Sequence, residues 1–354
     1  MIWNNIVTET LKVEYPFIQA PMLGVSTPEM VAAVSDYGGL GSLPVGGLSP
    51  DVTRGLIRKT KTLTHKPFAV NLFAHKIPDY TDDDLEPMRK VLLQLASKKG
   101  YKLNAADLAD FKLYTYQDQI DILVEEGISI VSFTFGCLDT LTIQLLKDNG
   151  CTLIGTATCI EEALVLQQQR IDMISVQGIE AGGHRGSFIE SMPLPQVALF
   201  SLLPQVRKVV NVPCIAAGGI NSAGTMKAAF VLGADAVQIG TAFIGTKESE
   251  AIVSHKVRLK QIKDTDTTLT RAFSGRWARG IRNELMQEIE QAGVPIPAYP
   301  LQNSLTAKLR KLAQQNDDGE YTSMWAGQSA LSTGLTESRK VVKSLIEQYE
   351  SLYK

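Results

Sequence analysis

The feature that most constrains this chain is a short apolar, β-rich run that recurs eight times, each time followed by a stretch of helical pattern. Near-continuously apolar strands that alternate with amphipathic helices indicate a parallel sheet buried on both faces. Eight such units predict an α/β fold of the closed (β/α)8 or TIM barrel type, although the pattern alone leaves an open doubly wound sheet as an alternative. The runs are FIQA at 17–20, GLGSL at 39–43, FAVNLF at 68–73, ISIVSFTF at 128–135, CTLIGTA at 151–157, DMISVQ at 172–177, VPCIAAGG at 212–219 and DAVQIGT at 235–241.

Two regions depart from this repeat and suggest how the chain is divided. We expect the barrel to occupy residues 1–245, interrupted after the third strand by a polar insertion at about 74–116 with one or two helices, which would form a flap over one barrel end. Residues 246–303 are rich in charge and are expected to form a small helical lobe. Residues 304–354 are expected to pack back on the barrel.

Composition excludes several classes of partner. The chain has 354 residues, 44% of them hydrophobic, and a formal net charge of -2, so charge gives no reason to expect nucleic acid or an anionic membrane surface. No run approaches the roughly 20 apolar residues of a membrane span, and no signal peptide opens the chain. The four cysteines form no C-x-x-C pair and are expected to be buried thiols. We therefore expect a soluble cytoplasmic protein, with a homodimer left open.

Glycines after the seventh and eighth strands form the first candidate site. In a (β/α)8 barrel the chemistry lies at the C-terminal ends of the strands, and many such barrels hold a cofactor phosphate after strands seven and eight. Gly218 and Gly219 end the seventh strand, and Ile239, Gly240 and Thr241 end the eighth. Glycine lets backbone N–H groups approach an anion closely. The pair of motifs predicts a phosphate cradle, whereas simple tight turns are the alternative.

Amide side chains at strand ends form a second candidate group. Gln19, Asn71, Gln177 and Gln238 end the first, third, sixth and eighth strands. Amides both donate and accept, which matches the alternating donors and acceptors along the edge of a flavin ring. Each amide alone could equally cap a loop. We also assign Ala20, Pro21 and Met22, which follow Gln19, to the cofactor site. Met22 could lie under the flavin ring or simply pack in the core.

The stretch QGIEAGGHRG at 177–186 places a histidine among glycines directly after the sixth strand. Imidazole titrates near neutral pH, so on a loop at the barrel mouth His184 can take or deliver a proton. Gly182 and Gly183 would let the backbone pass close to a cofactor. A polar residue in a tight turn is the alternative.

Other arrangements of catalytic residues are not supported. No serine lies in a G-x-S-x-G elbow and no cysteine in a protease-like context. We expect no metal, because Glu180 is the only nearby partner of His184 with ligand character and no second histidine lies at metal-ligand spacing. His65, His75 and His255 lie in polar or charged segments and are expected at the surface.

The motifs QAPM, GGLGSL, PFAVNLF, GTATC, QGIEAGGHRGSF, PCIAAGGI and LGADAVQIGTAF resemble, in the same order, those of the nitronate monooxygenases, long called 2-nitropropane dioxygenases. AFSGRWARGI, YPLQNSLT and MWAGQSA extend the resemblance to residues 5–335. It implies an FMN-dependent barrel that detoxifies alkyl nitronates, propionate 3-nitronate being the expected substrate, with O2 as oxidant and a carbonyl compound and nitrite as products. It implies His184 as the active-site histidine. The FMN contacts that it implies are Asn71, Gln177, Gly182, Gly219, Gln238, Gly240 and Thr241.

Several points stay open after this comparison. Tyr299 and Lys308 are candidates for holding a substrate carboxylate, against a packed tyrosine and an exposed lysine. FMN-containing enoyl-acyl carrier protein reductases, which use NAD(P)H, share the EAGGH and glycine motifs and are the nearest alternative. A non-catalytic flavin-binding protein is an alternative of another class. His184 could take a proton from carbon or hydrogen-bond a nitronate oxygen.

Overall fold

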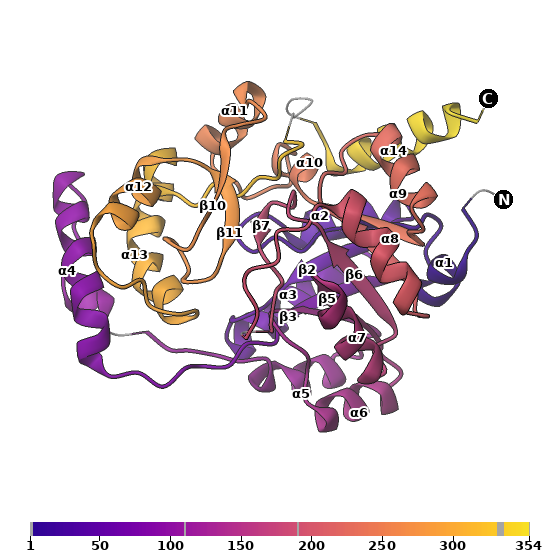
Figure 1. Cartoon of the computed structure of the whole chain (residues 1–354), viewed down its shortest axis with the longest axis horizontal. Coiled ribbons are helices and arrows are strands. Elements are labelled where there is room, and N and C mark those ends of the chain that lie inside the picture. Colours follow the sequence, from indigo (N-terminus) through magenta and orange to yellow (C-terminus); the bar gives the residue numbers. More distant parts are fainter. Residues whose placement is uncertain (1–2, 110, 190, 331–335, 354) are drawn as a thin grey trace.

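Eight parallel strands form a barrel in the computed structural model, which describes residues 3–109, 111–189, 191–330 and 336–353. Their order is β1-β9-β8-β6-β5-β4-β3-β2. The ring closes between β1 and the segment before β2, where the Gln19 N–H donates to the Leu40 carbonyl at 2.9 Å. All eight predicted strands are confirmed, and closure decides for the (β/α)8 barrel against the open sheet (Figure 1). The strands are β1 (Phe17–Gln19), β2 (Gly41–Pro44), β3 (Phe68–Phe73), β4 (Ile130–Thr134), β5 (Thr152–Ala157), β6 (Met173–Gln177), β8 (Cys214–Ala217) and β9 (Ala236–Ile239).

Helices surround the barrel, and several of them begin at a residue whose side chain caps the first turn. Thr27 and Ser49 accept hydrogen bonds from the first turns of α2 and α3, and a proline follows each of them at the first helical position. Ser222 forms a capping box with Thr225 at the start of α9. The helices are α2 (Pro28–Asp36), α3 (Pro50–Leu63), α5 (Gln117–Glu125), α6 (Thr140–Asp148), α7 (Ile160–Gln168), α8 (Leu199–Val209), α9 (Ala223–Val231) and α10 (Thr241–Ile244).

The two ends of the barrel are closed differently. Helix α1 (Ile6–Leu11) packs Val7 and Leu11 onto an inner cluster that includes Ile18 and Ile130 near the strand starts. Helix α14 (Ser338–Ser351) packs on α2 and α9, so both chain termini lie on the same side of the barrel (Figure 1). The opposite end, where the strands finish, is left for the functional site. No helix in the described part of the chain has both the length and the apolar character that a membrane span requires.

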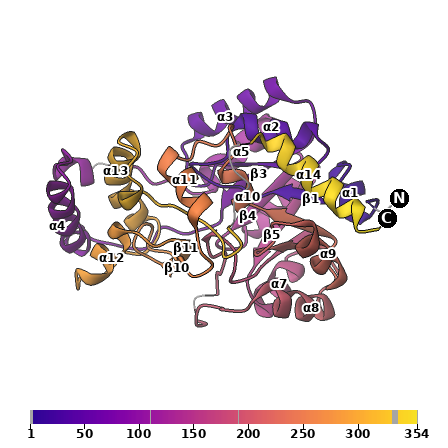
Figure 2. The same cartoon turned by 90° about the horizontal axis from the view of Figure 1, so that it is seen from above.

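A lobe beside the barrel has a hydrophobic core of its own. Helix α4 (Asp82–Lys98), from the insertion, packs with α12 (Glu284–Gln291) and α13 (Leu301–Gln315) around residues such as Phe273 and Leu305. Figure 2 shows these three helices together on the side away from the barrel. The helical part of the insertion therefore belongs to the lobe, whereas Lys112, Leu113 and Tyr114 near its end line the cavity at the mouth of the barrel. Short elements complete this part of the chain: 3-10 helices at Ala106–Leu108 and Gly319–Tyr321, and α11 (Val253–Gln261).

The lobe also contains strands, which corrects the expectation of a purely helical segment at 246–303. β10 (Thr267–Thr270) and β11 (Ala278–Ile281) pair antiparallel, and β11 pairs in turn with the two-residue β7 (Gly183–His184) from the barrel. This pairing joins residues nearly a hundred positions apart, so local sequence patterns do not reveal it. The expected boundary at residue 303 falls inside α13. We therefore propose a division in which the insertion and α13 belong to the lobe.

The approach of α2 to β2 predicts a matched pair of glycine effects. A Cβ on Gly41 would lie 2.3 Å from the Val31 carbonyl oxygen of α2, so Gly41→Ala should lower the free energy of unfolding by about 1–3 kcal/mol through overpacking. Gly55 in α3 faces open space, and Gly55→Ala should raise the free energy of unfolding by about 0.5–1 kcal/mol. Urea titrations of both variants test this. Equal stabilities would contradict the close packing of α2 on β2.

Candidate active site

A cavity of about 430 Å³ opens where the barrel strands end and the lobe begins. Residues from both parts line it, because the loops after the strands and one face of α13 converge there. Most of the site residues predicted from the sequence are brought together in this one lining. They are Ala20, Pro21, Met22, Asn71, Gln177, Gly182, Gly183, His184, Gly218, Gly219, Gln238, Gly240, Thr241 and Tyr299.

Three predicted site residues lie outside the lining. The Gln19 amide is fully buried and is used within the barrel: it donates to Ser26 Oγ at 2.9 Å and accepts from the Ser42 N–H at 3.0 Å. Ile239 is buried in the core between sheet and helices. The Lys308 side chain is 48% exposed and pairs with Asp107 at 3.6 Å. Gln19 and Ile239 are therefore structural, and Lys308 points away from the cavity.

The glycine motifs after β8 and β9 form a concave backbone surface. Gly218 and Gly219 have φ values of +111° and +69°, which side chains rarely adopt. The N–H groups of Gly219 and Gly240 make no hydrogen bond within the described residues. Thr241 Oγ1 accepts from the Gly327 N–H at 3.0 Å, so its hydroxyl proton remains to be donated. Several backbone and hydroxyl donors with no acceptor of their own suit a phosphate group, although the Glu180 side chain lies beside Gly219, 3.6 Å from where a Cβ on that residue would stand.

A late segment of the chain completes this surface. Gly327 binds Thr241, and the Gln328 N–H donates to the Glu180 carbonyl at 3.0 Å. The segment passes so close to Gly182 that a Cβ there would lie 2.5 Å from the Gly327 nitrogen. Gly182 is therefore needed for the contact between two backbone segments, which is a reason beyond the close approach to a cofactor expected from the sequence.

The predicted amides differ in how free they are. Asn71 donates to Ser132 Oγ at 3.0 Å, which leaves its carbonyl oxygen for the cavity. Gln238 makes no side-chain hydrogen bond within the described residues. Gln177 Oε1 accepts from Arg185 and from the Gly186 N–H, both at 2.9 Å, and Gln177 Nε2 donates to the His184 carbonyl at 3.0 Å. Gln177 therefore holds the turn that carries His184 while it lines the cavity.

Arg185, which the sequence analysis did not single out, supports the same turn from behind. Its guanidinium is completely buried and donates to the Gly178 carbonyl at 2.6 Å as well as to Gln177. Burial lowers the pKa of Arg185 to about 10, so it remains charged at neutral pH. It also donates to the Gln177 carbonyl at 3.2 Å, so three acceptors on residues 177 and 178 bind one cation, which fixes the chain after β6.

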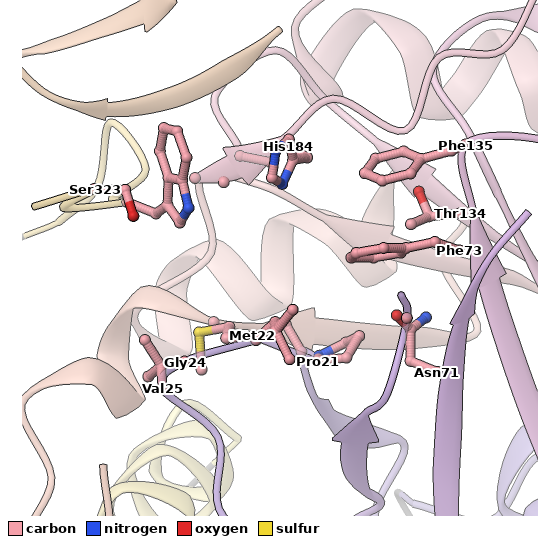
Figure 3. A pocket seen from close by; sticks show the side chains of 18 of the residues that line it. Pro21, Met22, Gly24, Val25, Asn71, Phe73, Thr134, Phe135, His184 and Ser323 are labelled. Atoms are coloured by element: carbon pink, nitrogen blue, oxygen red, sulfur yellow. The ribbon is translucent and has the colours of Figure 1, made fainter. Parts of the chain in front are cut away.

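His184 stands on the cavity wall inside an aromatic enclosure. Its Nε2 lies 2.7 Å from Ser274 Oγ, and its ring centroid is 5.4 Å from those of Phe135 and Trp325. Figure 3 shows His184 and Phe135 on one side of the cavity, with Pro21 and Met22 facing them from the other side. A planar group placed between these two walls would have His184 above one face.

The enclosure keeps His184 neutral. Burial, reinforced by the positive charges of Arg276 and Arg310, lowers the pKa of His184 to about 3. Burial also raises the pKa of Tyr299, so its phenol stays protonated at neutral pH. The chamber therefore presents a neutral imidazole and a neutral phenol in a positive electrostatic field. Such a field favours an anionic ligand.

Two other histidines correct the expectation of surface positions. His75 and His255 are 4% and 3% exposed and line the same cavity, whereas His65 is exposed as expected. His75 Nδ1 lies 3.1 Å from the Phe73 carbonyl oxygen. Burial lowers the pKa of each buried histidine to about 4. Polar neighbours in the sequence were misleading, because the lobe covers both residues.

Sequence reasoning also missed other lining residues, among them Phe73, Phe135, Arg310 and Trp325. The two phenylalanines end β3 or directly follow β4, so the rule that strand ends carry the site would have found them. Arg310 lies seven residues after Asn303, on the same face of a helix. Trp325 has no comparable local signal, since it belongs to a loop placed by the tertiary fold.

The comparisons with known proteins agree with this geometry. A family model described as nitronate monooxygenase matches residues 4–348. The chain belongs to the nitronate monooxygenase family. A probable nitronate monooxygenase of Staphylococcus saprophyticus is 39% identical over 97% of this chain and 96% of its own length. A probable nitronate monooxygenase of Staphylococcus aureus is 38% identical over 99% of both chains. The protein is accordingly an enzyme of a flavin-dependent oxidoreductase family.

Solved structures of the same fold include two with significant sequence identity. A nitroalkane oxidase from Streptomyces ansochromogenes has a TM-score of 0.88 and 34% identity and covers 99% of both chains. FabK from Thermotoga maritima has a TM-score of 0.77 and 27% identity, and covers 99% of this chain and 97% of its own. Both likenesses extend over the barrel and the lobe together.

The buried His184 predicts a pH effect on stability. Its pKa is about 3 in the folded protein and about 6.5 when unfolded. The contribution of His184 to the free energy of unfolding is therefore complete above pH 6.5. It is lost as the pH falls from 6.5 towards 3, because the unfolded chain takes up the proton first. Between pH 7 and 4.5 the loss should be about 2 kcal/mol.

Urea titrations of the flavin-free protein at both pH values measure this loss. His184→Asn should abolish this loss of stability at low pH, whereas His65→Asn, at an exposed position, should leave it unchanged. An unchanged pH dependence in His184→Asn would contradict the neutral, buried state.

Proposed function

We propose that the protein binds FMN and oxidises alkyl nitronates, propionate 3-nitronate in particular, with dioxygen to a carbonyl compound and nitrite. Atoms and charge balance when two nitronates react per dioxygen. The observation that carries the proposal is the neutral His184 on one wall of a cavity that ends in a glycine cradle, in a chain of the nitronate monooxygenase family. A cytoplasmic role in nitronate detoxification is part of the proposal.

The lining is suited to FMN in two places. The free N–H groups of Gly219 and Gly240, with the Thr241 hydroxyl, would hold the phosphate. The amides of Asn71 and Gln238 would meet the edge of the ring. Pro21, Met22, Gln177, Gly182, Gly183 and Gly218 would surround it. When bound, the flavin supplies the electron acceptor for the substrate.

His184 would act on the nitronate through a neutral imidazole. An anion bound beside it raises the pKa of the ring, so an N–H donor to a nitronate oxygen is strengthened when substrate arrives. For a neutral nitroalkane the unprotonated ring nitrogen would instead take the α-proton. Ser274, which bonds Nε2, holds the ring in one orientation for either task. The aromatic side chains around it limit water and leave an apolar space for O2.

Two other functions were compatible with the sequence. An enoyl-acyl carrier protein reductase would consume NAD(P)H with a crotonyl thioester, whereas the proposed enzyme would release nitrite from propionate 3-nitronate without nicotinamide. The family match and the curated relatives favour nitrite release without nicotinamide. A flavin whose spectrum responds to neither substrate without oxygen would favour a non-catalytic role.

His184→Asn tests the proposed role of the imidazole. The variant should retain FMN but lower turnover of propionate 3-nitronate by about a hundredfold, the scale of a lost proton-transferring group. Nitrite release and visible flavin absorbance measure the two properties separately. His65→Asn serves as the control at an exposed position. A variant with the normal rate would remove His184 from the mechanism.

Gly219→Val tests the phosphate cradle. A branched side chain at φ +69° is strained, and its Cβ would lie 3.6 Å from the Glu180 side chain, so the backbone of the cradle should be displaced and the purified variant should carry little or no FMN. Gly224→Val, at an exposed position at the start of α9, is the matched control and should remain yellow. If Gly219→Val binds a full complement of FMN, the phosphate lies elsewhere.

A further inference from the structure

One face of α13 lines the cavity with polar side chains that the proposed reaction does not use. Asn303, Arg310 and Gln314 all lie on this face, seven and four residues apart, as helical geometry requires. Lys308 is two residues from Arg310 and projects to the opposite side, where it meets Asp107. The cation that faces the cavity from this helix is therefore Arg310.

The charge of Arg310 is not balanced within the described part of the chain. Its guanidinium donates to Thr306 Oγ1 at 3.0 Å, to the carbonyl and side-chain oxygens of Asn303 at 3.0 and 2.8 Å, and to Ser323 Oγ at 3.4 Å. All these acceptors are neutral, and no described carboxylate forms an ion pair with it. Burial lowers its pKa to about 10, which still leaves it charged at neutral pH. Arg310 is only half-buried by surface area, since it borders the cavity, but a partly buried charge without a counter-ion still costs free energy that a bound anion would offset.

The neighbours of Arg310 add hydrogen-bond donors and no acceptor of comparable strength. Because Asn303 Oδ1 accepts from Arg310, the amide NH2 of Asn303 is left for another partner, and Asn303 lines the cavity. The Tyr299 phenol is protonated and makes no hydrogen bond in the described chain. One guanidinium N–H on Nη1 is also unused. A planar guanidinium flanked by two neutral donors matches a carboxylate.

The charged end of this donor cluster lies away from the place proposed for the flavin edge. Arg310 reaches Ser323, and Figure 3 places Ser323 beyond His184, on the side away from Phe135, Phe73 and Asn71. His184 therefore stands between Arg310 and that edge, while the Tyr299 ring lies nearer the edge, 5.3 Å from Phe135 and 6.2 Å from His184 between ring centroids. A substrate with its nitronate carbon at His184 would extend its other end towards Arg310.

We propose that Arg310, with Asn303 and Tyr299, binds a carboxylate at the end of the substrate opposite the nitronate, and so makes the enzyme selective for nitronates that carry an acidic tail. The proposal rests on the proposed function and names the residue that sets its substrate class. It also moves the carboxylate contact from Lys308, as expected from the sequence, to the opposite face of the same helix.

The test compares two nitronates that differ only in this tail. In propyl-1-nitronate a methyl group replaces the carboxylate of propionate 3-nitronate. Arg310→Met should lower the ratio of the two kcat/KM values by about 10- to 100-fold, the scale of a lost charge-assisted contact, with the change mainly in KM for the acidic substrate. Arg310→Lys should keep part of the preference. Lys308→Met, which removes an exposed cation from the same helix, should leave the ratio within about threefold of wild type.

The outcomes separate this proposal from the proposed function. An equal loss for both nitronates would overturn it, since Arg310 would then serve the nitronate end. An unchanged ratio would overturn it as well. If wild type turns over neither nitronate, the proposed reaction fails, and binding decides the role of Arg310.

Binding is measured by calorimetry on the wild-type holoenzyme with two nitro compounds. 3-Nitropropionate should bind at least about tenfold more tightly than 1-nitropropane, which lacks the carboxylate. This measurement does not depend on turnover or on the folding of any variant. Equal affinities would overturn the carboxylate subsite, and a preference that persists in a folded Arg310→Met would place it elsewhere.

Discussion

The hydrogen bonds between Gln177, Arg185 and the turn they enclose are the interaction on which the site depends. A buried guanidinium binds the side-chain oxygen of Gln177 and the Gly178 carbonyl, and the Gln177 amide binds the His184 carbonyl. Because Arg185 and Gly178 are buried and Gln177 is half-buried, loss of one group would leave the others without partners, which is costly. These hydrogen bonds therefore hold the turn in one conformation, and the turn fixes the backbone position of His184.

The electrostatics of the cavity depend on which of the groups around it carry a charge. The histidines that line it are neutral because burial and nearby cations disfavour their protonation. Arg310 remains charged at neutral pH and donates to neutral oxygens. Such a cavity disfavours a bound cation and favours a delocalised anion. Affinity for an anionic substrate and a depressed histidine pKa are thus two results of one arrangement.

The sequence was informative where structure is local and uninformative where it is not. Alternating strands and helices predicted the barrel, and the strand-end rule gathered Asn71, His184 and Gly219 into one cavity. The same rule misplaced Gln19, because an amide at a strand end can face the barrel interior as well as its mouth. The burial of His75 and His255 depends on the lobe, whose pairing of β7 with β11 joins distant segments. The sequence analysis named Lys308 and not Arg310 as a cation of the site, because it did not consider which face of the helix each side chain occupies.

The pairing of β7 with β11 has a mechanical consequence. His184 is in register with Ala278 of β11, and its Nε2 contacts Ser274, so the lobe holds the imidazole from one side. The turn after β6, which Arg185 fixes, holds the same residue from the barrel side. The glycine cradle belongs to the barrel. A rotation of the lobe relative to the barrel would therefore move Ser274 and Arg310 and would strain His184, which is anchored to both parts.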